Sequence, residues 1–422
     1  MEGYKIDRIF SNVDIIDYQE KAILVGNDEE SVSELARLAE TAGVKIEGKL
    51  IHRKDKINAS YYIGTGKLKE LDILKEHLDV NVIIFDNDLT PAQFKNLEEK
   101  LDVKIIDRTQ LILDIFALHA RSKESKIQVE LAQLEYMLPK LKGQGINLSR
   151  LGAGIGTRGP GETKLEVDRR RIESKISRLK TKLNEIKKNR KIQRVKRTDP
   201  LIALIGYTNA GKSTLMNLLT DADTIAVDQL FATLDSTIRQ TNLPFGKQII
   251  ITDTVGFINK LPHKLVASFS ATIEEIKEAD ILIHLVDADN TSIDKHIKVV
   301  NQLLEDMDIL DKERILVFNK IDKIDGEKKD ELHFRYPEAL FISAANGKGK
   351  EKLLNYISEI ILNNMTTIKI DLPYNKVRLV NQIHEEGEII SEEYSGDSVI
   401  VEAKVNKRLA NKLEKYKIFK NG

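Results

Sequence analysis

A phosphate-binding pattern constrains the fold more than any other feature of this 422-residue sequence. An apolar run at residues 201–205 leads directly into G-x-x-x-x-G-K-S at residues 206–213, and an apolar helical segment follows. Glycines in such a loop let backbone N–H groups turn toward a phosphate at the N-terminus of a helix, where the helix dipole is positive. Lys212 is expected to reach the β- and γ-phosphates, and the Ser213 hydroxyl to bind Mg²⁺. A strand, a loop and a helix in this order predict a parallel α/β domain.

Three more patterns follow in the order that a nucleotide pocket needs, and the first concerns the γ-phosphate. The strand predicted at residues 249–253 ends in a carboxylate, which begins the D-x-x-G pattern Asp253-Thr254-Val255-Gly256. Asp253 is expected to hold Mg²⁺ through a water molecule, and the N–H of Gly256 to bond the γ-phosphate. Contacts with the γ-phosphate make such a segment sensitive to the state of the nucleotide.

The other two patterns are suited to reading the base. Asn319-Lys320-Ile321-Asp322 follows a strand predicted at 315–318, and Ser343-Ala344-Ala345 follows one at 340–342. The Asp322 carboxylate can accept hydrogen bonds from N1–H and the exocyclic amine of guanine, whereas adenine offers neither donor in that arrangement. A backbone N–H of the last pattern can meet the guanine O6. Four patterns in this order predict a GTP-binding domain, because nucleotides bind at the carboxyl edge of a parallel sheet.

The composition limits the binding partners and the cellular compartment that we expect for this protein. Lys+Arg and Asp+Glu both number 66, so the formal net charge is +0 and any surface for a polyanion must be local; DNA is not an expected partner. The chain contains no cysteine, which excludes disulfides, thiolate metal sites and a cysteine nucleophile. No window approaches the roughly 18 consecutive apolar residues of a membrane span, and a signal pattern is absent, so we expect a cytoplasmic protein without an integral membrane segment.

Length and patterning predict a multidomain α/β protein of four parts. They are an N-terminal α/β domain (1–120), a helical hairpin forming an antiparallel coiled coil (121–198), a P-loop GTPase domain (199–364) and a C-terminal α+β domain (365–422). The first part alternates strands with helices, and Thr90-Pro91 is predicted to begin one of those helices. The last part has a β-α-β-β-α-β pattern, ferredoxin-like by analogy alone.

Two heptad seams predict the hairpin. Their members are Ile127, Leu131, Leu134, Leu138 and Leu141, then Ile172, Ile176, Leu179, Leu183 and Ile186. The Gly-rich stretch 143–162 between them is predicted to be a loop. It is either a flexible linker or the tip of the hairpin, and the two seams favour a tip.

The second helix of the hairpin concentrates positive charge. Residues 164–197 contain 15 Lys or Arg against 4 Asp or Glu, a local balance of +11. This is either a solvated helix face or a surface for phosphates, and the excess of one sign favours phosphates. The segment has no aromatic residue for base stacking, so structured RNA is the better guess. The RNA-contact candidates in the tip and helix are Arg150, Arg158, Lys164, Arg169, Arg170 and Arg171.

Over about residues 10–365 the chain resembles the HflX family of translation-factor-type GTPases. The segments that carry the resemblance are residues 85–93, 128–134 and 154–166, together with 253–257. The resemblance implies a GTPase that binds the large ribosomal subunit, reaches its ribosomal RNA with the hairpin tip, and splits stalled or idle ribosomes under stress. Off the ribosome we expect a monomer. Alternative functions are a GTP-dependent RNA-remodelling or regulatory protein without splitting activity, and a nucleotide-binding scaffold.

The resemblance also places the first switch segment. It implies that Thr233, within Phe231-Ala232-Thr233-Leu234-Asp235, closes over the γ-phosphate as a second side-chain ligand of Mg²⁺; spacing alone does not separate Thr233 from Thr237. Lys212, Thr233 and Gly256 are therefore the predicted catalytic residues. The predicted GTP-binding set is Gly206, Tyr207, Thr208, Asn209, Ala210, Gly211, Lys212, Ser213, Thr214, Phe231, Ala232, Thr233, Leu234, Asp235, Asp253, Thr254, Val255, Gly256, Asn319, Lys320, Ile321, Asp322, Ser343, Ala344 and Ala345.

Three local features leave questions open. Ras-type enzymes have a Gln after D-x-x-G that orients the attacking water, and here the residue is Phe257, which predicts slow hydrolysis without a partner. Asn209 either binds K⁺ beside the phosphates or simply fits the loop. The stretch Gly64-Thr65-Gly66-Lys67 superficially resembles a second phosphate loop, but it lacks the full spacing, so a helix start is the simpler interpretation.

Overall fold

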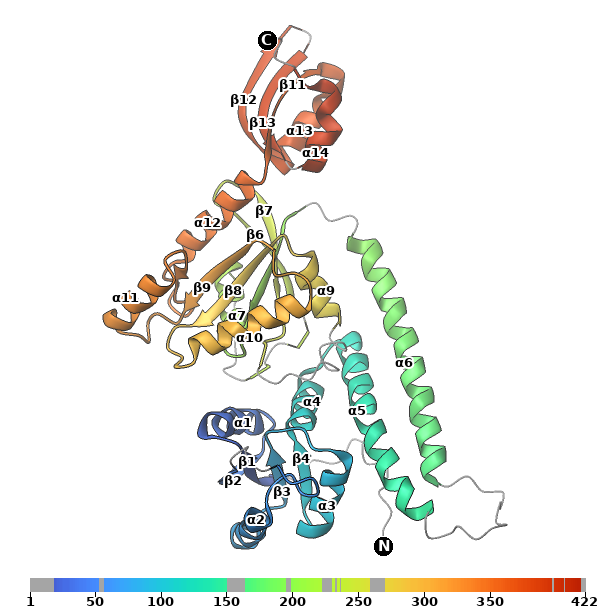
Figure 1. The fold of residues 1–422 in the computed structure, drawn as a ribbon. Coiled ribbons are helices and arrows are strands. Elements are labelled where there is room, and N and C mark those ends of the chain that lie inside the picture. Colours follow the sequence, from blue (N-terminus) through green and yellow to red (C-terminus); the bar gives the residue numbers. More distant parts are fainter. Residues whose placement is uncertain are drawn as a thin grey trace. The chain divides into compact units, whose positions relative to one another are not determined.

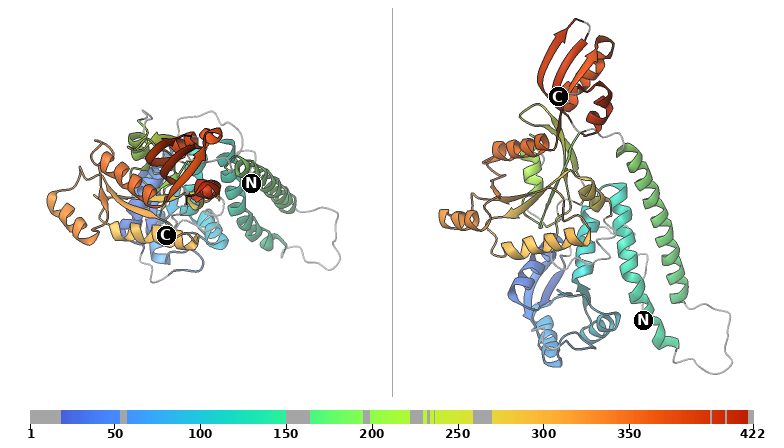
Figure 2. Two further views of the ribbon diagram at one scale, coloured as in Figure 1. Left: turned by 90° about the horizontal axis from the view of Figure 1, so that it is seen from above. Right: turned by 45° about the horizontal axis from the view of Figure 1, so that its top comes forward.

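The chain is represented by a computed structural model (Figures 1 and 2). It describes residues 19–52, 57–149, 164–194, 199–221, 230, 231, 234, 235, 237–258, 270–396, 398–405 and 407–418. The chain forms two compact units, residues 1–120 with 126–180, and residues 121–125 with 181–422. This division differs from the predicted four parts, whose boundaries remain a prediction.

The N-terminal domain is a parallel sheet with helices on both faces. Its elements are β1 (Lys21–Gly26), α1 (Glu29–Thr41), β2 (Lys45–Ile51), α2 (Thr65–Leu78), β3 (Val82–Phe85), α3 (Pro91–Leu101), β4 (Lys104–Asp107) and α4 (Arg108–His119). All neighbours pair in parallel in the order β2-β1-β3-β4, as the alternation of strands and helices predicts. Helices α2 and α3 pack on one face, and α1 and α4 lie together on the other.

The two helix starts predicted in this domain are confirmed, and the one at Thr90 has a cap. The Thr90 side chain accepts a hydrogen bond from the Gln93 N–H, and the Gln93 side chain accepts one from the Thr90 N–H, which is a capping box. Helix α2 begins at Thr65 with Gly64 in an extended conformation, so Gly64–Lys67 is a helix start.

Two long helices follow, α5 (Lys123–Ser149) and α6 (Lys164–Arg194), and most of their seam residues are buried as predicted, whereas Leu138 and Ile186 are only partly buried. The buried seam residues are Ile127, Leu131, Leu134, Ile172, Ile176, Leu179 and Leu183. Within the first unit the helices run alongside each other in opposite directions, and two ion pairs join them, Lys175 to Glu130 and Lys180 to Glu135.

The predicted start of the Gly-rich loop is wrong. Helix α5 continues through Gly143 and Gly145 to Ser149, so the loop cannot begin before residue 150. Each glycine in a helix costs only about 1 kcal/mol relative to alanine, which a long helix can absorb. The rest of the predicted tip lies outside the described residues.

The GTPase domain contains a six-stranded sheet in the order β10-β9-β8-β5-β7-β6. Its strands are β5 (Leu201–Gly206), β6 (Thr237–Asn242), β7 (Gln248–Asp253), β8 (Ile281–Asp287), β9 (Arg314–Asn319) and β10 (Leu340–Phe341). Only the edge strand β6 is antiparallel to its neighbour. Helices α7 (Lys212–Leu219) and α12 (Lys350–Asn363) cover one face, and α9 (Ser270–Glu278), α10 (Ile293–Asp306) and α11 (Gly326–Arg335) cover the other (Figures 1 and 2).

The C-terminal domain has the predicted order of elements, except that the predicted last strand is reduced to a single bridge. Its elements are β11 (Thr366–Pro373), a short 3-10 helix (Tyr374–Lys376), α13 (Val377–Glu386), β12 (Gly387–Ser395), β13 (Ser398–Val405), α14 (Lys407–Leu413) and a second 3-10 turn (Glu414–Tyr416). The sheet order is β11-β13-β12, antiparallel. A single bridge between Ile370 and Lys417 stands where a last strand was expected. In the part of the chain that is described, no helix is long and apolar enough to cross a membrane.

Candidate guanine nucleotide site

The phosphate loop joins β5 to α7 at the carboxyl edge of the sheet, and two of its residues must be glycine. Gly206 has φ +151°, and a Cβ there would lie 2.3 Å from the carbonyl oxygen of Leu285. Gly211 has φ +91°, and a Cβ there would lie 2.3 Å from the Asn319 side-chain nitrogen. Both positions combine a positive φ with close approach of another residue, the Leu285 backbone at Gly206 and the Asn319 side chain at Gly211, so a larger residue would displace the loop or that neighbour.

Lys212 is buried under this loop. Its Nζ donates hydrogen bonds to the carbonyl oxygens of Gly206, at 3.2 Å, and Tyr207, at 3.0 Å. Burial lowers the pKa of Lys212 to about 8, and the nearby Asp253 carboxylate opposes part of that shift. The ammonium is therefore held at the inner side of the loop, and its contact with phosphates stays a prediction.

Ser213 and Asp253 lie together below the loop. The Ser213 hydroxyl donates to the Asp253 carboxylate at 2.7 Å, although the two residues are 40 apart in sequence. Asp253 ends β7 and is 1% exposed. Among the described residues no group of three or more His, Cys, Asp or Glu could hold a metal. A hydroxyl beside a buried carboxylate fits Mg²⁺ bound directly by Ser213 and through water by Asp253.

The D-x-x-G segment pairs with the phosphate loop. The N–H of Thr208 donates to the Phe257 carbonyl at 2.7 Å, and the N–H of Phe257 donates to the Gly206 carbonyl at 3.0 Å. A Cβ on Gly256 would lie 2.8 Å from the Thr208 methyl and 3.0 Å from the Lys212 Nζ, so glycine is required there as well. The Phe257 ring is buried in the hydrophobic core under α9 and α10. It cannot orient an attacking water molecule.

One side chain connects the patterns for phosphate and base. Asn319 Nδ2 donates to the Ala210 carbonyl at 2.9 Å, and Asn319 Oδ1 accepts from the Ala344 N–H at 2.9 Å. Asn319 is buried, so both interactions stay dry. The N-K-I-D pattern therefore fixes the phosphate loop on one side and the Ser343–Ala345 loop on the other.

The predicted base-reading carboxylate is paired with another predicted site residue, a contact that the sequence patterns do not predict. The Ser343 hydroxyl donates a hydrogen bond to Asp322 Oδ1, which orients the exposed carboxylate. Lys320 has a left-handed backbone with φ +64°, and its Nζ lies 2.8 Å from the Asp287 carboxylate. Asp287 was missed as a supporting residue. Its position at the end of an apolar run on the same sheet edge was the available signal.

A pair of stacked aromatic rings connects the phosphate loop to α10. The Tyr207 ring stacks on the His296 ring of α10, with centroids 3.7 Å apart and planes 5° apart. Sequence reasoning did not find this pair, because the two residues are far apart in the chain and no local pattern joins them.

The switch segment is described only in part. Leu230, Phe231 and Leu234 are buried, whereas Ala232 and Thr233 lie outside the described residues. The Asp235 carboxylate accepts hydrogen bonds from the backbone N–H groups ahead of α5 and not from any part of the phosphate loop. Thr237, the alternative switch residue, is exposed at the start of β6.

Of the RNA-contact candidates, too, some lie within the described residues and others do not. Arg150 and Arg158 lie outside the described residues, and Lys164 begins α6. Arg169, Arg170 and Arg171 are all exposed on α6, and Arg169 is paired with Glu173 at 2.9 Å. The basic residues are thus brought to the surface of one helix.

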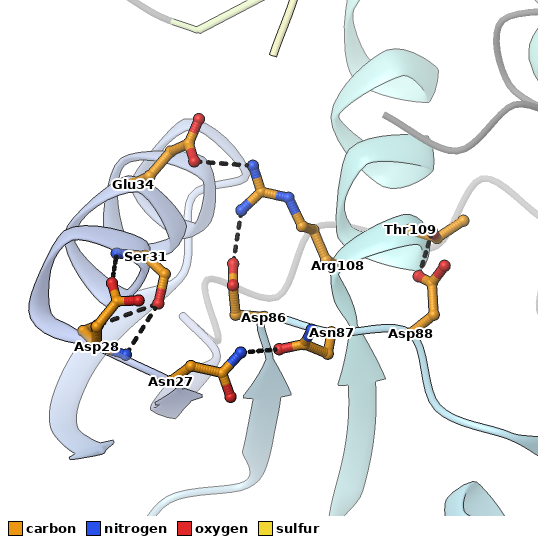
Figure 3. Close-up of polar contacts among 9 residues, drawn as sticks. All are labelled: Asn27, Asp28, Ser31, Glu34, Asp86, Asn87, Asp88, Arg108 and Thr109. Atoms are coloured by element: carbon orange, nitrogen blue, oxygen red, sulfur yellow. Dashed lines mark hydrogen bonds and ion pairs between the residues drawn. The ribbon is translucent and has the colours of Figure 1, made fainter. Parts of the chain in front are cut away.

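A second polar cluster lies at the carboxyl edge of the N-terminal sheet (Figure 3). Arg108 donates to Asp86 at 2.6 Å and lies 3.1 Å from Glu34. Nearby, Asn27 donates to Asn87 at 2.9 Å. In Figure 3 the Glu34 and Asp86 carboxylates share the Arg108 guanidinium, whereas Asp28 bonds Ser31 and Asp88 bonds Thr109. The network therefore ties the strand ends together.

Comparisons with known proteins agree with the nucleotide-site geometry. Family models described as "GTP-binding GTPase N-terminal", "GTP-binding GTPase Middle Region" and "50S ribosome-binding GTPase" match residues 29–117, 119–197 and 201–320. GTPase HflX of Caldanaerobacter subterraneus subsp. tengcongensis is 47% identical over 94% of this chain and 94% of its own. GTPase HflX of Escherichia coli K12 is 38% identical over 88% of this chain and 90% of its own.

Among solved structures, the complex of SsGBP with GDP covers 81% of this chain and 98% of its own, at 26% identity and a TM-score of 0.48. The family models and the curated relatives agree with one another along most of the sequence. The chain therefore belongs to the HflX family of GTPases and is a guanine nucleotide-binding GTP hydrolase with a ribosome-binding GTPase domain.

Proposed function

We propose that this GTPase acts in the cytoplasm as a monomer that binds the large ribosomal subunit and splits stalled or idle ribosomes under stress. We further propose that the ribosome stimulates its GTP hydrolysis. The observation that carries the second proposal is the burial of Phe257 in the core. With no polar side chain following Gly256, positioning of the water must come from a partner or from a rearranged switch segment.

Different residues of the chain bind the phosphates and the metal ion. The loop N–H groups and Lys212 bind the β- and γ-phosphates, and the Gly256 N–H bonds the γ-phosphate. Ser213 and Thr233 would hold Mg²⁺ directly, with Asp253 acting through water. When bound, Mg²⁺ neutralises the charge that builds up on the phosphate oxygens. Asn209 is the residue that would hold K⁺ beside them, if the ion is used.

Charge supports ribosomal RNA as the surface that the hairpin meets. The +11 balance of residues 164–197 stands against a formal net charge of +0 for the whole chain. Its exposed arginines suit the phosphate backbone of a folded RNA, which is recognised by shape and charge. The description of one matching family model as a 50S ribosome-binding GTPase points to the same partner.

Sedimentation of intact ribosomes tests this proposal. Ribosomes are mixed with the protein and a non-hydrolysable GTP analogue, then separated on a sucrose gradient. Conversion to free subunits is expected, and Lys212→Ala is expected to leave the ribosomes intact because it removes the phosphate-binding ammonium. Unchanged particles with the wild-type protein would instead support a GTP-dependent RNA-remodelling or regulatory role.

Hydrolysis rates test stimulation separately. The isolated protein is expected to turn over GTP slowly, and added large subunits to raise kcat. Turnover of about ten per second by the isolated protein, a rate typical of activated GTPases, would contradict the proposal.

A further inference from the structure

The start of α5 is held by a carboxylate from the predicted switch segment. Asp235 Oδ2 accepts hydrogen bonds from the backbone N–H groups of Arg121 and Ser122, both at 2.8 Å. More than a hundred residues of sequence separate the donors from the acceptor. All three residues belong to the second compact unit, whereas α5 continues from Lys126 in the first.

This contact is well placed to stabilise the beginning of the helix. The first N–H groups of a helix lack intrahelical partners, and a negative charge is favourable beside them. The Ser122 hydroxyl accepts from the Ser125 N–H at 3.0 Å, so Ser122 caps α5, and Asp235 in turn bonds the N–H of that cap residue.

A second connection joins α6 to the other nucleotide-sensing segment. Lys187 of α6 lies 3.4 Å from Glu274 of α9. The neighbouring Glu275 is buried and accepts a hydrogen bond from the Thr252 hydroxyl at 3.0 Å. Thr252 directly precedes Asp253 in β7, so α9 connects the end of α6 to the residue before the D-x-x-G pattern.

We infer that Asp235 is a positioning residue that couples the nucleotide state to the start of α5 and hence to the helical hairpin. The inference rests on the proposed function in one respect, which is the contact of Thr233 with the γ-phosphate. Asp235 is two residues from Thr233, and each residue of extended chain spans about 3.3–3.6 Å. Two residues of chain span at most about 7 Å, so a nucleotide-dependent change at position 233 is transmitted to the Asp235 backbone. Because hydrogen bonds of 2.8 Å depend closely on distance and angle, we expect Arg121 and Ser122 to lose this acceptor in one of the two states.

The absence of cysteine from the sequence permits a clean test in the full chain. Spin labels are placed on Lys69→Cys in α2 and Asp330→Cys in α11, which are exposed helix positions in different units. The distance distribution between the labels is measured by pulsed EPR with GDP and with a non-hydrolysable GTP analogue. The protein with Asp235 intact is expected to give two different distributions. Asp235→Ala is expected to give the same distribution with both nucleotides.

The contact is also weakened from the other side by Arg121→Pro, which removes one of the two donor N–H groups and leaves Asp235 in place. This variant serves if Asp235→Ala binds nucleotide poorly or does not fold. Asp280→Ala is the matched control, because Asp280 likewise accepts a backbone N–H, that of Leu201 at 2.7 Å, at the opposite end of β5. It is expected to keep both distributions.

Nucleotide affinity gives a second readout, because the contact and nucleotide binding are thermodynamically linked. If the contact differs between nucleotide states, breaking it changes the ratio of the GDP and GTP-analogue dissociation constants, by about fivefold or more for a typical coupling. The inference is overturned if Asp235→Ala, or Arg121→Pro in its place, keeps the wild-type distributions and this ratio. It is also overturned if the protein with Asp235 intact gives one distribution with both nucleotides. These outcomes are obtained without ribosomes, so they are independent of the sedimentation result.

Discussion

Lys212 is desolvated before it meets a phosphate, and this gives nucleotide binding a pH dependence. Its pKa is about 8 because of burial, and bound phosphates will raise it again. GTP affinity is therefore expected to fall as the pH rises through 8, by about tenfold at pH 9 relative to pH 7. Titration calorimetry in buffers of different ionisation enthalpy checks this through the protons taken up on binding. Affinity that stays flat across this range would contradict it, and Lys212→Met should remove the dependence.

Base selectivity depends on the hydrogen-bonding character of one side chain. Asp322 offers only acceptors, and guanine presents two donors to it. Asp322→Asn supplies one acceptor and one donor, which suits xanthine with its N1–H and C2 carbonyl. We expect GTP to bind about 10³–10⁴-fold more weakly and xanthosine triphosphate to bind better than GTP. Competition against a fluorescent nucleotide measures both affinities.

The outcome that contradicts this is an Asp322→Asn variant that still prefers GTP. Ser343→Ala is the informative companion, because it removes only the hydroxyl that orients Asp322. It is expected to lower GTP affinity by less than the Asn variant and to keep the preference for guanine.

At the scale of elements, the sequence is most informative where a motif and a periodic pattern coincide. The strands and loops of the GTPase domain are found because each ends in a recognisable string, such as the D-x-x-G that begins at Asp253. Two elements of the N-terminal domain were missed for physical reasons. Strand β2 contains Gly48 at an irregular register and buries only Leu50 fully. Helix α4 follows β4 with no intervening loop.

Side-chain pairings between distant elements were the part that no local pattern contained. One carboxylate, Asp107, receives hydrogen bonds from the N–H groups of Leu89 and Gln110 and from the Tyr136 hydroxyl. Lys140 of α5 lies 3.6 Å from the same group and above the Tyr136 ring. These contacts join α5 to the N-terminal sheet within one unit, and they depend on the folded arrangement of three separate segments.

The Asp114 carboxyl group, which lies beside α5, destabilises the folded state at neutral pH. Burial raises the pKa of Asp114 to about 6, against a smaller lowering by Lys104. The folded state therefore binds more protons than the unfolded state between about pH 4 and pH 6, and stability from this group falls as pH rises through that window. The full effect is on the order of 2–3 kcal/mol. Asp114→Asn is expected to be more stable than wild type at pH 7, with the difference shrinking toward pH 4.

Urea unfolding midpoints of both proteins at several pH values measure this difference. The amide of asparagine can keep the hydrogen bond to Gln133 that the carboxylate makes. A difference between the two proteins that does not change between pH 4 and pH 7 would contradict the assignment of a raised pKa.

At the scale of the molecule, the formal charges cancel, but the positive charges are concentrated in one segment of the sequence. The +11 of residues 164–197 requires a balance of −11 over the rest of the chain, since the total is +0. Neutrality keeps non-specific attraction to nucleic acid low, whereas the local excess gives one helix a strong attraction to phosphates. Such a distribution favours docking in one place on a polyanion over coating its surface.

Salt dependence tests the proposed contact of that helix with phosphates. Each phosphate neutralised by a side chain adds about 0.7–0.9 to the slope of log affinity against log salt concentration. Replacing the adjacent exposed residues Arg170 and Arg171 by alanine is expected to weaken binding to purified large ribosomal subunits and to reduce that slope by about 0.7–0.9 for each phosphate that is no longer neutralised. Lys352→Ala, an exposed cation on α12, is the control and should leave both quantities unchanged. Weaker binding with an unaltered slope would mean that the arginines act by shape or hydrogen bonding without releasing counterions, and the electrostatic account of the hairpin would then be wrong.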